Sequence, residues 1–398
     1  MAHQILEIKV NGARRKVLVQ GRVPVYYPNL YVSLNHIRRA LNTQQKLLEH
    51  IGLAEDFLAY EGIDLVARLQ ERPTSHYLTD SELSRFVDNA SRHKSALNER
   101  YAGVRRLRTS NRTVGRSHAR QRVEAASKYF QFLYEKLGDG VTKVDAAKDL
   151  EERLARKVRA AKPAWKKRKL SDVKGLTDEE RELLLEVMHP QSQRNPFASE
   201  ALKLRNYIIL LLGLELGLRR AEMLLIKISD ISWNSKRISV VDLEDERVDL
   251  RTLAPKFKTH ERVLEMGDEL AWAIKKYIDV FRLCGESKSE ANKHPFLLVA
   301  HRRNEGKPLS LKALDGVFPR VGKVAPQLRH IHPHLLRHDS VCMLLENARA
   351  ELEVLTPEDR WIQTQIMLTT AFGWSKKSDM PQLYGAKFWG EVLGRRGE

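Results

Sequence analysis

Hydrophobic and polar positions alternate at the start of the chain. Leu6, Ile8 and Val10 precede the dipeptide Asn11-Gly12, and further apolar residues alternate after it. Alternation predicts strands, and Asn-Gly between two alternating runs is the strongest local indication of a tight hairpin. We therefore predict a short N-terminal β-hairpin segment over residues 1–32.

From residue 33 the apolar spacing becomes that of helices. A second stripe, between Ala119 and Leu137, repeats every three or four residues and stops at Gly138, as a helix followed by a terminating glycine would. Residues 33–160 are therefore predicted to form a small helical domain. The first predicted helix would be capped by Ser33, and its buried face would comprise Leu34, Ile37, Leu41, Leu48 and Ile51.

The polar side of this helical region is basic. Few acidic residues separate the arginines between positions 105 and 122. A run of charge is usually a solvated face, but a run without acidic partners favours contact with phosphates. A basic linker, residues 161–175, follows the helical domain. The predicted nucleic-acid contacts are Arg105, Arg106, Arg108, Arg112, Arg116 and Arg120, together with Lys166, Lys167 and Arg168.

A second domain is predicted over residues 176–398. Thr177 and Glu180 have the spacing of a capping box at a helix start, and residues 202–216 are apolar nearly all round, as in a buried helix. Residues 237–243 and 262–266 are rich in Val, Ile and Leu and predict two strands. The expected fold is therefore mainly α with small β-sheets.

Composition restricts the class of partner. The chain has 398 residues, and 69 Lys and Arg against 51 Asp and Glu give a net charge of +18, which indicates a polyanionic partner. Cys284 and Cys342 provide neither a disulfide framework nor zinc spacing. The start of the chain lacks the pattern of a signal peptide and the longest apolar run is too short for a membrane span, so a cytoplasmic location without a membrane partner is expected.

Two segments carry candidate chemistry. His334 and Arg337 are three residues apart behind Pro333, so they share a face if the segment is helical. An imidazole beside a guanidinium can clamp and protonate an oxyanion, although a helix start rich in His and Arg is the alternative. Arg219 follows the most hydrophobic stretch and would be held rigidly, as a catalytic clamp requires. A purely structural pair with Glu222 is the alternative there.

Four segments in a fixed order resemble the tyrosine recombinase, or phage integrase, family. They are Gly-Leu-Arg-x-x-Glu at 217–222, Lys-Thr-x-x-Arg at 258–262, His-x-Leu-Arg-His at 334–338, and Gly-Trp at 373–374 followed by Tyr384. Each motif is weak by itself, and their order in a basic chain carries the resemblance. The resemblance covers residues 176–398 with good motifs. Residues 33–160 resemble the family's helical core-binding domain only in kind, and no part of the family matches residues 1–32.

The resemblance implies a set of catalytic residues. Lys256 is an alternative to Lys258, because the hairpin that carries the lysine varies in length. The interval from Trp374 to Tyr384 is one residue longer than the family's usual one. The implied set is Arg219, Lys258, His334, Arg337, Trp374 and the nucleophile Tyr384.

The activity implied by the resemblance is site-specific cleavage and rejoining of DNA, as in integration, excision or transposition of a mobile element. The two arginines would bind the nonbridging oxygens and Lys258 would protonate the leaving 5′-oxygen. A 3′-phosphotyrosyl link conserves bond energy, so neither a cofactor nor a metal is expected. The expected assembly is a homotetramer on two DNA sites, with DNA-bending or directionality proteins as compatible partners.

Three alternatives remain from the sequence. A type IB topoisomerase uses the same groups, an accessory DNA-binding protein would carry a decayed site, and an RNA-binding protein would rest on charge alone. The apolar stripe near the C-terminus distinguishes a recombinase from a topoisomerase, because a recombinase needs contacts between protomers. We predict that Phe388, Trp389, Val392 and Leu393 dock into a neighbouring protomer in a cyclic arrangement, the alternative being that they fold back on their own domain.

Overall fold

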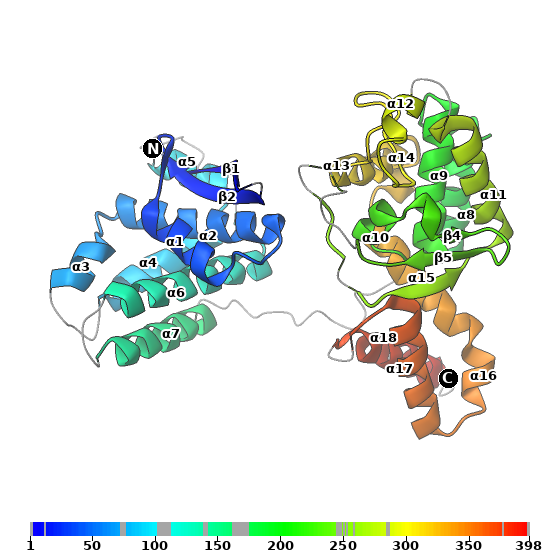
Figure 1. Ribbon diagram of the computed structural model, residues 1–398. Helices are drawn as coiled ribbons and strands as arrows, with labels where there is room; N and C mark the ends of the chain where they lie inside the picture. Colours follow the sequence, from blue (N-terminus) through cyan, green and yellow to red (C-terminus); the bar gives the residue numbers. More distant parts are fainter. Residues whose placement is uncertain are drawn as a thin grey trace. The chain divides into compact units, whose positions relative to one another are not determined.

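The structure, a computed structural model, divides the chain into two units, residues 1–166 and 167–398 (Figure 1). Helices dominate both units, and each has one three-stranded antiparallel sheet. The predicted fold, mainly α with small β-sheets, is therefore confirmed. The structure describes residues 3–11, 13–71, 77–101, 113–137, 142–160, 175–243, 249, 251, 254–257, 259–283, 287–375 and 378–395.

The first unit begins with the predicted hairpin. Its strands pair so that Val10 lies opposite Ala13, and Asn11 has a φ of +49°, the left-handed conformation that tight hairpin turns require; Gly12 lies outside the described residues. Leu18 is buried against Gly52 of the helical part, where an added Cβ would lie 3.1 Å from Leu18 Cδ1. The strands are β1 (Gln4–Val10), β2 (Ala13–Gln20) and β3 (Val23–Pro24).

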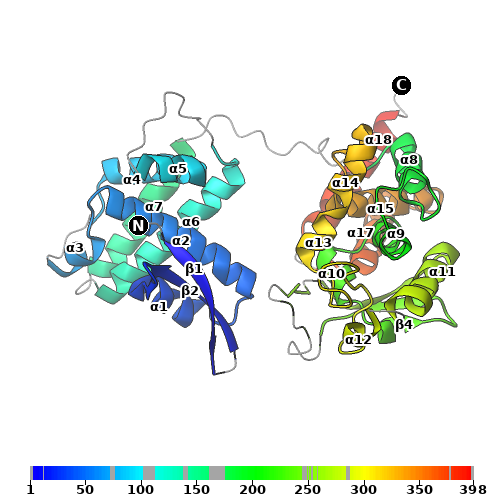
Figure 2. The same ribbon diagram turned by 90° about the horizontal axis from the view of Figure 1, so that it is seen from above.

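The hairpin and the helices of this unit share one hydrophobic core. β2 packs on α1 and α2, as the views in Figures 1 and 2 agree. The predicted stripe up to Leu137 is confirmed as α6; Gly138 lies outside the described part. The helices are α1 (Tyr26–Asn35), α2 (Leu41–Tyr60), α3 (Leu65–Glu71), α4 (Asp80–Ser91), α5 (Lys94–Tyr101), α6 (Arg116–Leu137) and α7 (Thr142–Ala160).

The helix predicted to start at Ser33 is wrong. The chain is already helical from Tyr26, breaks after Asn35 and becomes helical again at Leu41. Leu34 is 58% exposed, so it does not belong to the buried face. The tertiary reason is Tyr31, whose ring packs 5.2–5.8 Å from the aromatic rings of α6. This contact fixes α1 as a separate helix.

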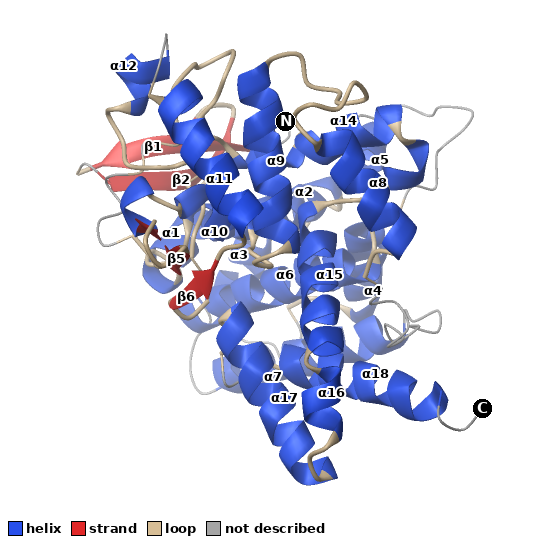
Figure 3. Cartoon of the chain, turned by 90° about the vertical axis from the view of Figure 1, so that its right-hand side faces the viewer, coloured by secondary structure: helices blue, strands red, loops and turns tan. Residues whose placement is uncertain are grey.

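The second unit confirms several local predictions. Thr177 Oγ1 accepts from the Glu180 backbone N–H at 3.2 Å, and the Glu180 carboxylate accepts from the Thr177 N–H at 3.0 Å, which is the predicted capping box. The two predicted strands pair as β5 and β6, drawn in red in Figure 3. The first elements of the unit are α8 (Asp178–Met188), α9 (Glu200–Leu214), α10 (Arg220–Leu225), β4 (Ile231–Ser232), β5 (Arg237–Val240), β6 (Arg262–Glu265) and α11 (Asp268–Lys276).

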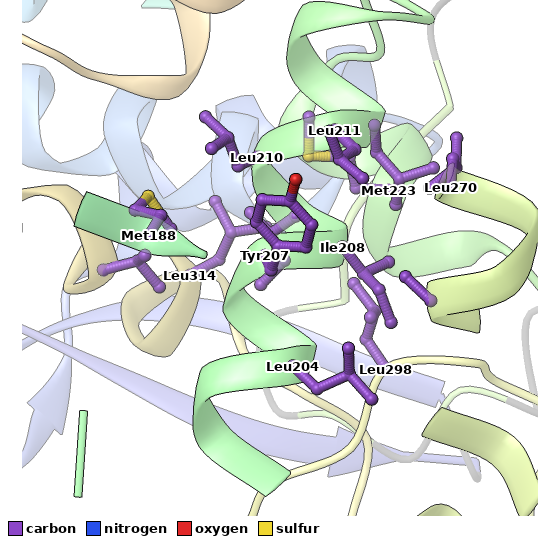
Figure 4. Close-up of a cluster of buried hydrophobic side chains, with 14 of the residues drawn as sticks. Met188, Leu204, Tyr207, Ile208, Leu210, Leu211, Met223, Leu270, Leu298 and Leu314 are labelled. Carbon is purple, nitrogen blue, oxygen red and sulfur yellow. The ribbon is translucent and has the colours of Figure 1, made fainter. Parts of the chain in front are cut away.

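Helix α9 lies at the centre of the second core. Figure 4 shows Leu204, Ile208 and Leu211 of α9 surrounded by side chains from other segments. Gly213 allows close approach to α15, because an added Cβ would lie 2.7 Å from Leu336 Cδ1. The same core therefore fixes the segments that hold the first and second arginine motifs. The later helices are α12 (Ser287–Ala291), α13 (Leu311–Asp315), α14 (Val317–Val324), α15 (Pro333–Asn347), α16 (Arg349–Glu353), α17 (Pro357–Phe372) and α18 (Met380–Arg395).

The C-terminal stripe folds back on its own unit. Trp389 is 7% exposed, its Nε1 donates to Thr364 Oγ1 at 3.2 Å, and the Arg360 guanidinium lies 4.9 Å from its ring centroid. Val392 is buried in the same small cluster; the side chain of Leu393 lies outside the described part. In the structure α16 and α17 cover this stripe, which is the alternative of folding back on its own domain. Within the described residues, no helix is long and apolar enough to cross a membrane.

Candidate active site

Arg337 joins three segments of the second unit. It lies near the start of α15 and is only 2% exposed. Its Nη1 donates to the Gly217 carbonyl at 2.7 Å and its Nη2 to the Phe372 carbonyl at 2.8 Å. The guanidinium is therefore held between the turn before α10 and the end of α17.

Two glycines make this approach possible. Gly217 has a φ of +57°, and a Cβ there would lie 2.3 Å from Phe372 Cε1. Gly373 has a φ of +60°, a Cβ there would lie 2.7 Å from the His260 carbonyl oxygen, and its own carbonyl accepts from the His260 N–H at 2.9 Å. Both positions need a left-handed backbone and no side chain, which glycine alone supplies at low cost.

Glu222 is the centre of an arginine cluster. It is 2% exposed, and its carboxylate accepts from the Arg219 N–H at 3.0 Å, from Arg219 Nη1 at 3.3 Å, and from Arg262 Nη2 at 2.9 Å. Thr259 Oγ1 donates to it at 2.7 Å, and Arg337 Nη1 lies 3.8 Å away. The pair of Arg219 with Glu222, the structural alternative from the sequence, is present. It also brings Arg219 and Arg337 to the same carboxylate.

The charges in this cluster are unbalanced. Burial raises the pKa of Glu222, but Arg262, Arg337 and Thr259 outweigh it, so the pKa lies below the ordinary value and the group is ionised. Burial and the neighbouring Arg219 lower the pKa of Arg337 to about 9, so the guanidinium remains cationic at neutral pH. Three guanidiniums around one carboxylate leave two positive charges. Because buried charge is costly without a partner, the cluster favours binding of an anion.

Trp374 connects Tyr384 to the arginine cluster, because it contacts both Tyr384 and Arg337. The tyrosine, on α18, is 3% exposed, and its ring stacks on Trp374 with centroids 5.6 Å apart and planes at 17°. The Arg337 guanidinium lies 5.3 Å from the Trp374 centroid. On the other side, the His338 ring lies 5.5 Å from Tyr384 and 4.2 Å from the His334 ring. Arg337, Trp374, Tyr384, His338 and His334 thus form one continuous group.

Four residues of the arginine cluster and of this group were not in the sequence-predicted catalytic set, and Glu222 is one of them. The others are Thr259 and Arg262, which anchor Glu222, and His338, whose ring contacts those of His334 and Tyr384. The sequence feature that could have identified these residues was their place in the Gly-Leu-Arg-x-x-Glu, Lys-Thr-x-x-Arg and His-x-Leu-Arg-His segments. Nothing in the local sequence indicates that Arg262, rather than Arg219 alone, would pair with Glu222.

Several predicted residues fall outside the described part of the chain. Lys258 is one of them, whereas Lys256 is described and half-buried. On α6, Arg116 is half-buried and Arg120 is exposed. Among the residues that are described, no group of three or more His, Cys, Asp or Glu could hold a metal ion. The predicted contacts that lie outside are Arg105, Arg106, Arg108, Arg112, Lys166, Lys167 and Arg168.

Comparisons of sequence identify relatives over part of the chain. A model of the phage integrase family matches residues 174–356. Tyrosine recombinase XerC of Staphylococcus carnosus is 26% identical over 152 residues, covering 38% of this chain and 44% of that protein. Tyrosine recombinase XerC of Staphylococcus epidermidis is 25% identical over 178 residues, covering 45% and 50%. The chain spans about half the length of the curated relatives it matches.

Solved structures of similar fold extend this comparison to the whole chain. The integrase of the transposon Tn1549, in complex with transposon right end DNA, is 15% identical, covers 94% of this chain and 98% of that chain, and has a TM-score of 0.52. The same integrase in complex with a circular intermediate DNA is 15% identical, covers 93% and 97%, and has a TM-score of 0.52. At this identity the likeness shows the fold. The family model over residues 174–356 identifies this part of the second unit as a phage integrase, or tyrosine recombinase, family domain.

Proposed function

We propose that this protein is a site-specific DNA recombinase that acts through a 3′-phosphotyrosyl intermediate on Tyr384. The observation that carries the proposal is the contact of Tyr384 with Trp374, which in turn lies against Arg337 of the positively charged cluster. A phenol linked to preorganised guanidiniums through one indole ring is placed for attack on a phosphodiester that those guanidiniums bind. The relatives are named recombinases, and the transposon integrase was solved with DNA.

The proposed roles follow from the placement of the groups. Arg219 and Arg337 bind the nonbridging oxygens of the scissile phosphate, each donor contributing about 10²–10³-fold in rate. The Tyr384 oxygen forms a bond to phosphorus while the bond from phosphorus to the 5′-oxygen breaks. The phenolic proton passes to His334, and the 5′-oxygen takes a proton from Lys258 or Lys256. Attack by the 5′-hydroxyl of another strand then releases Tyr384, and one phosphoester bond replaces another.

The polyanionic partner in this proposal is double-stranded DNA in the cytoplasm. Arg116 and Arg120 on α6 contribute phosphate contacts, and so do the predicted basic residues that lie outside the described part. A homotetramer on two DNA sites, with accessory proteins where direction is controlled, is part of the proposal. Because α18 buries its apolar stripe within its own unit, the contacts between protomers come from other surfaces.

Loss of the phenolic hydroxyl tests the nucleophile. Tyr384→Phe should retain DNA affinity and lose the covalent adduct on a duplex nicked near the crossover, resolved on a denaturing gel. Tyr277→Phe is the matched control, because Tyr277 is fully buried and its hydroxyl is bonded to His301 at 2.7 Å; this variant should still form the adduct. An adduct that persists in Tyr384→Phe would refute the assignment.

A second arm separates recombination from topoisomerase activity, which shares the adduct. Two labelled duplexes that carry a site should exchange strands, and the products should migrate as recombinants. Relaxation of supercoiled DNA without any strand exchange between sites would instead show a type IB topoisomerase.

A further inference from the structure

The first unit contains a cavity of about 550 Å³ that the proposed chemistry does not use. It lies where the β1–β2 hairpin, α2, α5 and α6 meet. Two basic side chains of its wall are buried, His50 and Arg122, and two are exposed, Lys94 and His118. A volume of this size is in the usual range for small-molecule sites, about 300–1,000 Å³.

Arg122 is a buried cation without an anionic partner. It is 6% exposed, and its Nη1 donates to the carbonyls of Ala90 at 3.0 Å and Arg92 at 2.6 Å. Both acceptors are neutral, and no carboxylate among the described residues forms an ion pair with it. The equally buried Arg153 of the same unit pairs with two carboxylates. Burial of a charge without a counter-charge is unfavourable. Arg122, whose Nη1 alone bonds to these carbonyls, therefore favours an anion in the cavity.

Two histidines of the same wall, His50 and His118, can become positively charged when an anion binds. Their rings lie 5.4 Å apart. Burial, His118 and Arg122 lower the pKa of His50 to about 4, and burial and Arg122 also lower the pKa of His118. Both are therefore neutral at pH 7. An anion between them would favour the protonated forms and so raise both pKa values.

The acidic groups of the wall do not cancel this charge. Asp56 is engaged by His3 Nδ1 at 2.7 Å. Glu49, exposed on α2, faces both His50 and His118, but the nearby Lys46 has the opposite effect on both. Neither carboxylate forms an ion pair with Arg122 or Lys94 among the described residues, so both cations stay available to an anion on the α5 and α6 sides of the cavity.

We propose that this cavity binds a phosphate group, supplied either by the DNA backbone or by a free nucleotide. A phosphate has enough acceptor oxygens for the remaining N–H groups of Arg122, for His50 and His118, and for Lys94, and charge-assisted bonds of this kind are the stronger ones. In the DNA case the inference rests on the proposed recombinase function, and it gives the first unit a defined backbone contact.

The test uses the full chain and compares two probes, inorganic phosphate and deoxyadenosine monophosphate, by titration calorimetry at pH 6 and pH 8. Binding should be accompanied by proton uptake beyond that of the probe itself, because a bound anion favours the protonated forms of His50 and His118. The double variant His118→Gln/Lys94→Gln removes two exposed groups and should bind at least about tenfold more weakly. Lys128→Gln is the matched control, because Lys128 lies on the same helix but outside the cavity and pairs with exposed Glu124; it should bind as the parent does.

A DNA arm identifies the source of the phosphate. If the source is DNA, duplex DNA should displace inorganic phosphate. The double variant should then reduce the slope of log affinity against log salt by about 0.9 per lost contact. If the source is a free nucleotide, the small probes should bind while the DNA affinity and salt slope of the double variant stay unchanged. Either result supports the proposal.

The proposal is overturned if the double variant alters neither the binding of the small probes nor that of DNA. The covalent-adduct assay keeps this failure separate from failure of the proposed function. An adduct on Tyr384 with an inert cavity would refute the cavity site alone. Conversely, phosphate binding in a protein that never forms the adduct would refute the recombinase chemistry alone.

Discussion

Replacement of Glu222 by Gln would remove the one negative charge from the arginine cluster while nearly keeping the shape. The carboxylate accepts bonds from Arg219, Thr259 and Arg262 and lies 3.8 Å from Arg337 Nη1. Glutamine has one acceptor oxygen, and its NH₂ group would point at a donor in either orientation. At least one buried donor would therefore lose its acceptor, and three guanidiniums would remain without a carboxylate between them.

The expected cost follows from which contacts are buried. The side chains of Glu222 and Arg262 are 1% and 5% exposed, and removal of one partner from a buried pair costs about 3–5 kcal/mol. The Arg219 side chain is 30% exposed, so its share is within about 1 kcal/mol. We therefore expect Glu222→Gln to lower the free energy of unfolding of the second unit by about 3–5 kcal/mol.

The pH dependence has a definite sign. The pKa of Glu222 in the folded protein lies below its ordinary value. Its contribution to stability is therefore present above the ordinary carboxyl pKa of about 4.3 and is lost as pH falls through the lower, folded value. Glu222→Gln should lack this part of the acid dependence.

Urea unfolding of the full chain, followed by tryptophan fluorescence, measures both effects. Five of the six tryptophans lie in residues 167–398, so the signal reports mainly the second unit. The matched control is Glu186→Gln, whose partner is Arg194 in an exposed pair; its effect should be within about 1 kcal/mol. A loss for Glu222→Gln no larger than the control's, with unchanged acid dependence, would refute the charge-cluster reasoning.

Further changes have similarly definite outcomes. Gly217→Ala should cost at least about 2 kcal/mol in urea unfolding, because it combines a left-handed φ with a Cβ inside Phe372; unchanged stability would contradict the observed turn. Trp389→Ala should cost about 3–5 kcal/mol while paired DNA complexes still form; the reverse pattern in native gels would favour docking between protomers. Lys258→Ala should regain cleavage with a 5′-bridging sulfur, which leaves without protonation, and rescue of Lys256→Ala instead would reassign the general acid. Log DNA affinity should fall against log salt with a slope of about −0.9 per phosphate contacted, and a flat dependence would exclude the backbone contacts.

Local chemistry made part of this structure predictable from sequence. Asn11 in the turn, the capping box at Thr177 and the continuous apolar run of α9 act within a few residues, so their patterns correspond to elements directly. The family motifs were also visible, because their residue order survives without knowledge of the fold. These features predicted the fold class and the candidate catalytic residues.

Patterns that give an apolar face do not give its partner. In the sequence, the stripe at Trp389 and Val392 is equally compatible with docking into a neighbouring protomer and with packing on its own unit. Only the positions of α16 and α17 show that it packs on its own unit in this structure. In the same way, the apolar spacing around Leu34 did not show that Tyr31 would pack on α6 and separate two helices.

The candidate sites themselves depended on tertiary structure. Arg337 bonds to a carbonyl 120 residues away, and Glu222 meets Arg262 across 40 residues. Arg122 looked like one basic residue of a run until burial against neutral carbonyls left its charge facing a cavity. The sequence determines which charges exist and predicts many of the helices. Whether a charge is solvated, paired or left uncompensated depends on distances between segments far apart in the chain, and only the folded structure determines those.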